Sequence, residues 1–176
     1  DQHGQRFSQV FFAAGGMGAT PTSDGHSCIA FPTNTGSGSI EAFEAISPLL
    51  VWRKEFTPDS GGMGKLRGGL GQEVEIEVTA PAPLRLSMLS DRQKYAAQGL
   101  FRGGPGGLVR VELADGTKPH PKSRTMLKPK DRLTMRFSGG GGYGEPAERD
   151  PEAVQRDVAA GYVSKEAALR DYNVKV

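Results

Sequence analysis

The sequence contains little of what disulfides, membrane spans or nucleic-acid contacts require. Cys28 is its single cysteine, so no disulfide can form within the chain, and we expect a reducing, cytoplasmic compartment. No stretch approaches the roughly 20 apolar residues of a membrane-spanning helix, and we expect neither membrane insertion nor a signal peptide. The 22 basic and 20 acidic residues nearly cancel without forming a basic run, which argues against nucleic-acid binding.

Apolar residues are also scarce, at 36%, whereas the 176 residues include 25 glycines and 12 prolines. The chain is long enough for one ordinary domain. Abundant glycine and proline are typical of a turn-rich β protein rather than a helical bundle. We therefore expect a mainly β, antiparallel fold with glycine-rich loops and two short C-terminal helices, which is α+β overall.

Several runs alternate between apolar and polar residues with the period of a β-strand. In residues 72–79, Val74, Ile76 and Val78 alternate with glutamates. Similar alternation predicts strands at 84–89, 108–113 and 131–137, and less regular patterns predict strands at 6–14, 27–31 and 49–56. The connection 80–83 is short enough for a β-hairpin from Gln72 to Ser90.

Capping residues predict three short helices. Ser39 and Pro48 bound the first, over residues 39–47. Asp150 is a good N-cap for a second helix, which Gly161 ends, and Ser164 caps the third. We expect a β-rich domain over 1–146, with the helical pair of 147–176 packed on it.

The run SGGGGYGEP, residues 138–146, matches the dinucleotide pattern G-x-G-x-x-G at Gly139, Gly141 and Gly144. That pattern binds a pyrophosphate where a strand leads through a tight turn directly into a helix. Here the best helix start, Asp150, comes six residues after Gly144. We therefore interpret Gly139 to Gly142 as a structural turn and not as a nucleotide site.

A second glycine cluster, DSGGMGKLRGGLGQ at residues 59–72, resembles a P-loop only superficially. Asp59 stands where the leading glycine is needed, and Leu66 follows Lys65 in place of the serine or threonine that binds Mg²⁺. We interpret these glycines as residues that permit positive φ or close backbone approach. The glycines assigned to such structural loops are Gly61, Gly62, Gly141 and Gly144.

Candidate chemical groups are few. Asp24, His26 and Cys28 would share one face of a strand, but no second cluster supports a metal, and we predict none in this chain. A Ser-His-Asp or Cys-His arrangement stays open, although the nucleophile pattern G-x-S-x-G is absent. Glu41 and Glu44 share a face of the first predicted helix, where they are either a functional pair of carboxylates or simply solvated surface residues.

The order of the glycine clusters carries more information than any one of them. The chain resembles the C-terminal third of the hydantoinase B / 5-oxoprolinase / acetone carboxylase family, from about Ala13 to Tyr172. Ser39 departs from the pattern, because many members have a proline there. The resemblance rests on these segments in this order: GGMGATPTSDG, TNT, EAFEAISPLLVWRKEFTPDSGGMGKLRGGLGQ, DRQKYAAQGLFRGGPG, and GGGGYGEPAERDPEAVQRDVAAGYVSKEAALRDY.

The resemblance implies a part of an ATP-dependent enzyme that opens cyclic amides such as hydantoin, N-methylhydantoin or 5-oxoproline. It implies that ATP and Mg²⁺ belong to a hydantoinase A-type partner, and a divalent metal to the N-terminal part of the chain's own subunit. We expect a hetero-oligomer in which this chain binds no cofactor and is inactive alone. The start DQHGQRFSQV, without Met, also suggests a piece of a longer polypeptide.

The resemblance also suggests residues that line the reaction chamber of the assembled enzyme. They are polar positions that match the family's pattern: Asn34, Glu41, Glu44 and Arg92. No catalytic residue is assigned. Two alternatives stay open, namely part of an ATP-dependent ketone carboxylase and a non-catalytic β scaffold or interaction domain.

Overall fold

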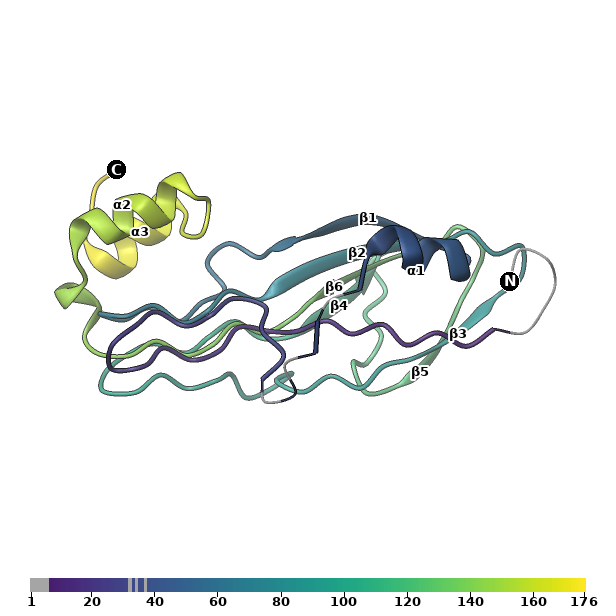
Figure 1. Cartoon of the computed structure of the whole chain (residues 1–176), viewed down its shortest axis with the longest axis horizontal. Helices are drawn as coiled ribbons and strands as arrows, with labels where there is room; N and C mark the ends of the chain where they lie inside the picture. Colours follow the sequence, from purple (N-terminus) through teal and green to yellow (C-terminus); the bar gives the residue numbers. More distant parts are fainter. Residues whose placement is uncertain (1–6, 32, 34, 37) are drawn as a thin grey trace.

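A computed structural model describes residues 7–31, 33, 35–36 and 38–176 of this elongated molecule (Figure 1). Two β-sheets and helix α1 (Ile40–Ile46) lie at one end, and helices α2 (Pro151–Ala159) and α3 (Lys165–Tyr172) lie at the other. Between them run long, extended, glycine-rich segments that belong to neither sheet (Figure 1). The fold is therefore α+β and antiparallel, with short C-terminal helices, as predicted.

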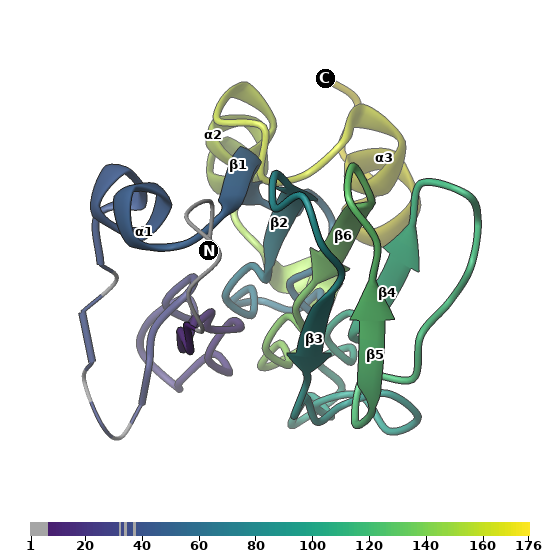
Figure 2. The ribbon, with the colours of Figure 1, turned by 90° about the vertical axis from the view of Figure 1, so that its right-hand side faces the viewer.

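The larger sheet has the strand order β1-β2-β6-β4, with every pair antiparallel (Figure 2). The smaller sheet pairs β3 with β5, also antiparallel. The strand bounds are β1 Leu49–Phe56, β2 Gln72–Val78, β3 Leu84–Ser87, β4 Arg110–Leu113, β5 Arg124–Leu127 and β6 Arg132–Arg136.

Three strand predictions are wrong. The hairpin from Gln72 to Ser90 does not form, because β1 and β6 occupy both edges of β2 and leave β3 to pair with β5. The described parts of 6–14 and 27–31 contain no strand. Cys28 has a positive φ of 51°, a conformation outside the β region.

The sheet core follows the alternation of β2. Val74, Ile76 and Val78 are buried in one apolar cluster with residues of the neighbouring strands. On the opposite face, Glu73 lies opposite Arg136 of β6 in the strand register, and the two side chains form an ion pair. The glutamate side chains of β2 thus form ion pairs with basic side chains of neighbouring strands and are not fully exposed to solvent.

The predicted N-cap residues are confirmed at the starts of all three α-helices in the described residues. Ser39 accepts the Ala42 N–H at the start of α1. Asp150 accepts a backbone N–H of α2, and Ser164 does the same for α3. Gly161 follows α2 with a positive φ of 72°. A short 3-10 helix, η1 (Pro146–Glu148), leads into α2.

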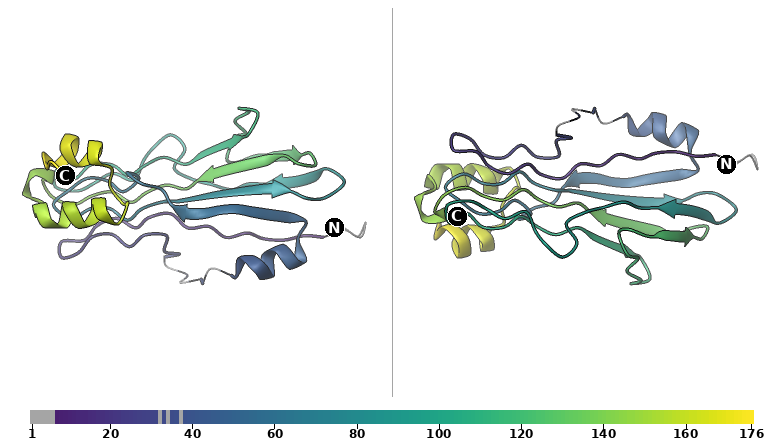
Figure 3. Two further views of the ribbon diagram at one scale, coloured as in Figure 1. Left: turned by 90° about the horizontal axis from the view of Figure 1, so that it is seen from above. Right: turned by 90° about the horizontal axis from the view of Figure 1, so that it is seen from below.

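The extended segments form what we call the glycine bundle: residues 15–19, 60–64, 66–71, 97–107 and 138–144, which run side by side (Figure 3). Residues 138–144 are its central strand, and their hydrogen bonds repeat every three residues. The N–H groups of Gly139 and Gly142 donate to one segment, at Gly107 and Gly104. Those of Gly140 and Tyr143 donate to another, at Gly69 and Leu66. A repeat of three residues is typical of extended helices rather than of β-sheets, whose period is two.

The prediction of a turn at Gly139 to Gly142 is therefore wrong. The run is extended, because each residue directs its backbone groups to a different neighbouring segment. It contains glycine for another reason: a Cβ at Gly140 would lie 2.0 Å from the carbonyl oxygen of Met17, and one at Gly142 would lie 2.0 Å from that of Met63. Only glycine permits backbones to approach this closely.

The glycines assigned to structural loops fit the same description. A Cβ at Gly61, Gly62 or Gly141 would lie 2.2 Å from a carbonyl oxygen of an adjacent segment. Gly144 instead has a positive φ of 77°, where the central strand ends and the chain turns toward η1. Close approach is thus the reason for glycine at the first three positions, and backbone conformation is the reason at Gly144.

Candidate functional site

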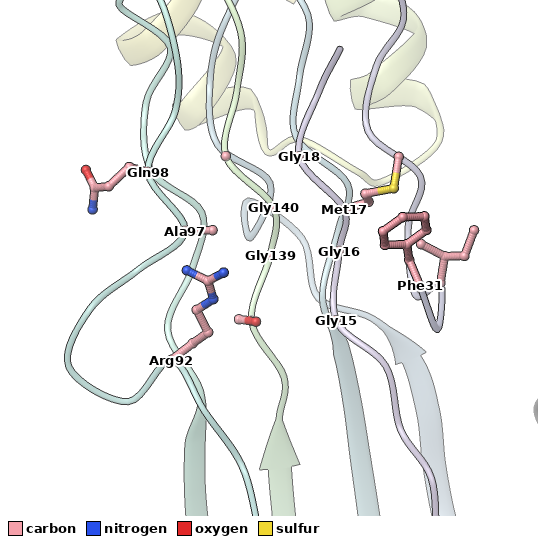
Figure 4. A pocket seen from close by; sticks show the side chains of 13 residues that line it. Gly15, Gly16, Met17, Gly18, Phe31, Arg92, Ala97, Gln98, Gly139 and Gly140 are labelled. Atoms are coloured by element: carbon pink, nitrogen blue, oxygen red, sulfur yellow. The ribbon is translucent and has the colours of Figure 1, made fainter. Parts of the chain in front are cut away.

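A pocket of about 480 Å³ opens on the side of the glycine bundle (Figure 4). Its floor is the central strand at residues 138–141. Residues 15–18 form one wall, with Phe31 beyond them, and Arg92, Ala97 and Gln98 form the other. Ile29 also lines the pocket. The pocket therefore combines a floor of peptide groups, an apolar side and a side with a guanidinium and an amide.

Arg92 is the charged residue of this pocket, and sequence reasoning had selected it. Its guanidinium lies between its own wall and the central strand (Figure 4). Within the described part of the chain, that exposed side chain makes no hydrogen bond, but its charge interacts with the neighbouring Asp91 carboxylate, which also pairs with Lys122. The backbone of Arg92 has a positive φ of 62° and its carbonyl accepts the Val109 N–H at 3.0 Å. Non-glycine residues held in this conformation are uncommon and occur often at functional sites.

The other predicted chamber residues lie elsewhere. Asn34 is outside the described residues. Glu41 is exposed in the first turn of α1, where the Ser39 hydroxyl donates to its carboxylate and lowers its pKa. The Glu44 carboxylate accepts the N–H of Val51 at 2.7 Å, which ties α1 to β1. Of the described members of this set, Arg92 is the one that the structure brings into the pocket, and a role for Glu41 and Glu44 in an assembled chamber stays a prediction.

A buried ion network connects the glycine bundle to the C-terminal helices. Arg149 donates to both carboxylate oxygens of Asp24 at 2.8 Å and to Asp157 of α2 at 2.7 Å. Arg67, in the bundle, donates to the same Asp157 through Nε at 3.1 Å. The side chains of Arg149 and Arg67 are 3% and 6% exposed. Since the charges are paired and hydrogen-bonded, they can remain ionised in the interior.

The network sets the protonation state of Asp24. Burial alone would raise the pKa of the Asp24 carboxyl, but the hydrogen bonds and charge of Arg149, together with the backbone N–H of Arg67, lower it. The same carboxylates raise the pKa of Arg149. The Asp24 carboxyl is thus ionised near neutral pH, and it is hydrogen-bonded to the Arg149 guanidinium and to the Arg67 backbone N–H.

Sequence reasoning missed this network. Asp24 was considered only beside His26 and Cys28, as a weak set of metal ligands. The Cys28 thiol instead lies against the carbonyl of Leu70 at 3.7 Å, and burial raises its pKa to about 11. A local signal for the pairing hardly exists, because Asp24 and Arg149 are far apart in the sequence.

Two further features are absent from the described residues. No group of three or more histidine, cysteine, aspartate or glutamate side chains there is arranged to hold a metal ion. In the same residues, every helix is too short or too polar to cross a membrane.

Comparisons with known proteins place these features in context. The family model described as hydantoinase B/oxoprolinase matches residues 1–146. The B subunit of a putative D-/L-hydantoinase from Pseudomonas sp. strain NS671 is 33% identical over 149 residues, which cover 81% of this chain and 25% of that protein. The crystal structure of ATP-dependent caprolactamase from Pseudomonas jessenii matches with a TM-score of 0.77 and 28% identity, over 92% of this chain and 30% of that one.

A nucleotide-free structure of acetone carboxylase is similar as well, with a TM-score of 0.75 and 25% identity over 91% of this chain and 26% of that one. Both cyclic-amide and ketone enzymes thus contain a segment with this fold. The chain spans about a quarter of the length of the curated relatives that it matches.

Proposed function

Because the chain belongs to the hydantoinase B/oxoprolinase family, we propose that it is the C-terminal domain of a hydantoinase B-type subunit, within an ATP-dependent hydrolase of cyclic amides. The proposed substrates are hydantoin, N-methylhydantoin or 5-oxoproline. The observation that carries this proposal is the family match over residues 1–146. The hydantoinase and caprolactamase relatives support the choice of cyclic amides.

The proposed role of this chain is to hold the shape of the assembly. Ring opening driven by ATP needs phosphate-binding groups, an activating metal and a positioned base. We assign the divalent metal to the N-terminal part of the subunit, as the family resemblance implies, and derive no step through it. ATP and Mg²⁺ are assigned to a hydantoinase A-type partner, and the hetero-oligomer to the cytoplasm.

The test compares residues 1–176 with the complete parent subunit mixed with its ATP-binding partner. Each preparation receives ATP, Mg²⁺ and one cyclic amide, and the assay follows ring-opened product and ADP together. We expect turnover by the complete complex and none by residues 1–176, because the chain spans about a quarter of its relatives' length. Turnover by residues 1–176 alone would show that the catalytic centre lies in this chain.

The similarity to acetone carboxylase favours a second candidate, an ATP-dependent ketone carboxylase. The same assay separates the two reactions when bicarbonate and a ketone replace the cyclic amide. Bicarbonate-dependent consumption of the ketone, with every cyclic amide unchanged, would select the carboxylase. A complex that is inactive in both assays would favour a non-catalytic scaffold.

A further inference from the structure

The hydrogen-bond repeat of the central strand predicts two pairs at the floor of the pocket. Farther along the strand, the Leu100 N–H donates to the carbonyl of Gly142, and the Leu100 carbonyl accepts the N–H of Gly144, both at 3.0 Å. Three residues earlier, a continued repeat would pair Ala97 in the same way with the Gly139 carbonyl and the Gly141 N–H.

Those two pairs do not form. The Ala97 carbonyl accepts the Gly106 N–H at 2.9 Å instead. Within the described residues, neither the Gly139 carbonyl nor the Gly141 N–H has a hydrogen-bond partner. Both glycines are buried, and buried backbone groups without partners are rare in native proteins. The floor of the pocket therefore contains one acceptor and one donor without a partner among the described residues, and the Ser138 N–H is a second such donor.

Gly18, on the opposite wall, is the second observation. A Cβ at the neighbouring Gly16 would lie 1.9 Å from the carbonyl oxygen of Gly69, so packing requires glycine there. A Cβ at Gly18 would meet only the Gly141 carbonyl oxygen, at an ordinary 3.6 Å. Packing within the described residues therefore does not require glycine at position 18. The absence of a side chain there keeps the space over Gly141 open.

We propose that this pocket is the place of one more extended strand of the bundle, supplied by the remainder of the hydantoinase B-type subunit. The proposal rests on the proposed function. An extended polypeptide offers N–H and C=O groups along its length, which suit the unused Gly139 carbonyl and Gly141 N–H, as in the addition of a strand to a sheet edge. The remainder of the subunit is the source, because about three quarters of the length of three curated relatives, and more in others, lies outside the part matched by this chain.

Arg92 specifies the chemistry of the docked strand. Its guanidinium lies at the edge of the pocket without a hydrogen bond to a described residue, and the nearby Asp91 carboxylate, with which its charge interacts, is paired with Lys122. A guanidinium binds a carboxylate through two parallel hydrogen bonds, which a lysine cannot reproduce. The docked strand therefore has an aspartate or glutamate beside Arg92, and small residues over Gly18, where the opposite wall is bare backbone.

The experiment uses the complete parent subunit with the photoreactive residue p-benzoylphenylalanine in place of Gly18. The matched control has the same residue in place of Gly38, which lies outside this pocket and where an added Cβ would meet no atom within 4 Å. After irradiation, mass spectrometry identifies the crosslinked peptides. We expect position 18, and not position 38, to crosslink to one peptide of the same subunit outside residues 1–176.

Crosslinks from position 18 only within residues 1–176, only to the ATP-binding partner, or no different from those of position 38 would overturn the proposal. A second measurement compares melting temperatures of the complete subunit. Gly18→Leu and Arg92→Lys should each lower the melting temperature relative to Gly38→Leu, and equal values for all three would also refute it. Both readouts need neither ATP nor substrate, so a complex without turnover would contradict the proposed function while leaving the docking result intact.

Discussion

Gly140→Ala should destabilise this protein more than most exchanges of one small residue for another. The new Cβ would lie 2.0 Å from the carbonyl oxygen of Met17, which is backbone and cannot rotate away. The segment 15–19 must therefore retreat from the central strand. It is joined to that strand by the N–H groups of Gly16 and Ala19, at 2.9 Å each.

The size of the effect follows from those two hydrogen bonds. A buried polar group that loses its partner costs about 1–3 kcal/mol, so two broken bonds cost roughly 2–6 kcal/mol. Replacing glycine by alanine restores about 0.4–1 kcal/mol, because the unfolded chain loses conformational freedom. We therefore expect Gly140→Ala to lower the free energy of unfolding by roughly 1–6 kcal/mol, against a typical total of about 5–15 kcal/mol.

Gly18→Ala is the matched control, because it makes the same chemical change in the same bundle. Its Cβ would meet its nearest neighbour at 3.6 Å, so only the unfolded-state term applies. We expect it to raise the free energy of unfolding by about 0.4–1 kcal/mol. Urea denaturation followed by circular dichroism measures both variants. If the two differ by less than about 0.5 kcal/mol, the order of a measurable change, close backbone approach does not explain the glycines.

Three further predictions concern the ion network and the turns. Arg149→Ala should lower the free energy of unfolding by about 3–5 kcal/mol, because it leaves buried carboxylates unpaired, whereas Arg156→Ala, on the surface, should change it by about 0–1 kcal/mol in the same urea titration. The folded-state pKa of Asp24 is lowered, so the contribution of its carboxylate to the free energy of unfolding is complete above the unfolded pKa of 3.8 and is lost as the pH falls through the folded pKa. The difference in the free energy of unfolding between wild type and Asp24→Asn should therefore shrink as the pH falls below 3.8, and a constant difference would contradict the pairing. Gly161→Ala should lower the free energy of unfolding by about 1–2 kcal/mol, because an alanine is strained at the φ of 72° found there. Lys130→Gly should raise it, because it removes a side chain at a φ of 69°, and thermal unfolding measures both variants.

The sequence was most informative where the signal is local. The strand predicted at 49–56 coincides with β1, and the caps at Ser39, Asp150 and Ser164 start the helices as predicted. A cap is a contact between residues two or three positions apart, so the sequence contains the whole interaction. Alternation in β2 likewise identified its buried face before its partners were known.

Predictions failed where the deciding contact is distant in the sequence. The connection 80–83 allows a hairpin, but only the arrival of β6 at the second edge of β2 decides against it. The run at Gly139 to Gly142 looked like a turn, because each glycine is locally permissive. Its extended form depends on hydrogen bonds to several separate segments of the bundle. Arg92 was selected as a polar position in a resemblance, and the pocket around it comes from three of those segments.

The glycine bundle explains how a chain with so few apolar residues can hold a rigid, extended shape. Each glycine ordered in an extended segment loses more conformational entropy than any other residue would. Close backbone contact offsets part of this loss, because nearly every peptide group of the central strand is then hydrogen-bonded away from water. The β-sheet fixes one end of the bundle, and the Arg149 network fixes the other against α2. Other backbone groups of the bundle, such as those of the buried Gly64, also have no hydrogen-bond partner among the described residues. The groups at Gly139 and Gly141 differ because these residues line an open pocket, which is why we place the missing strand there and not along another side of the bundle.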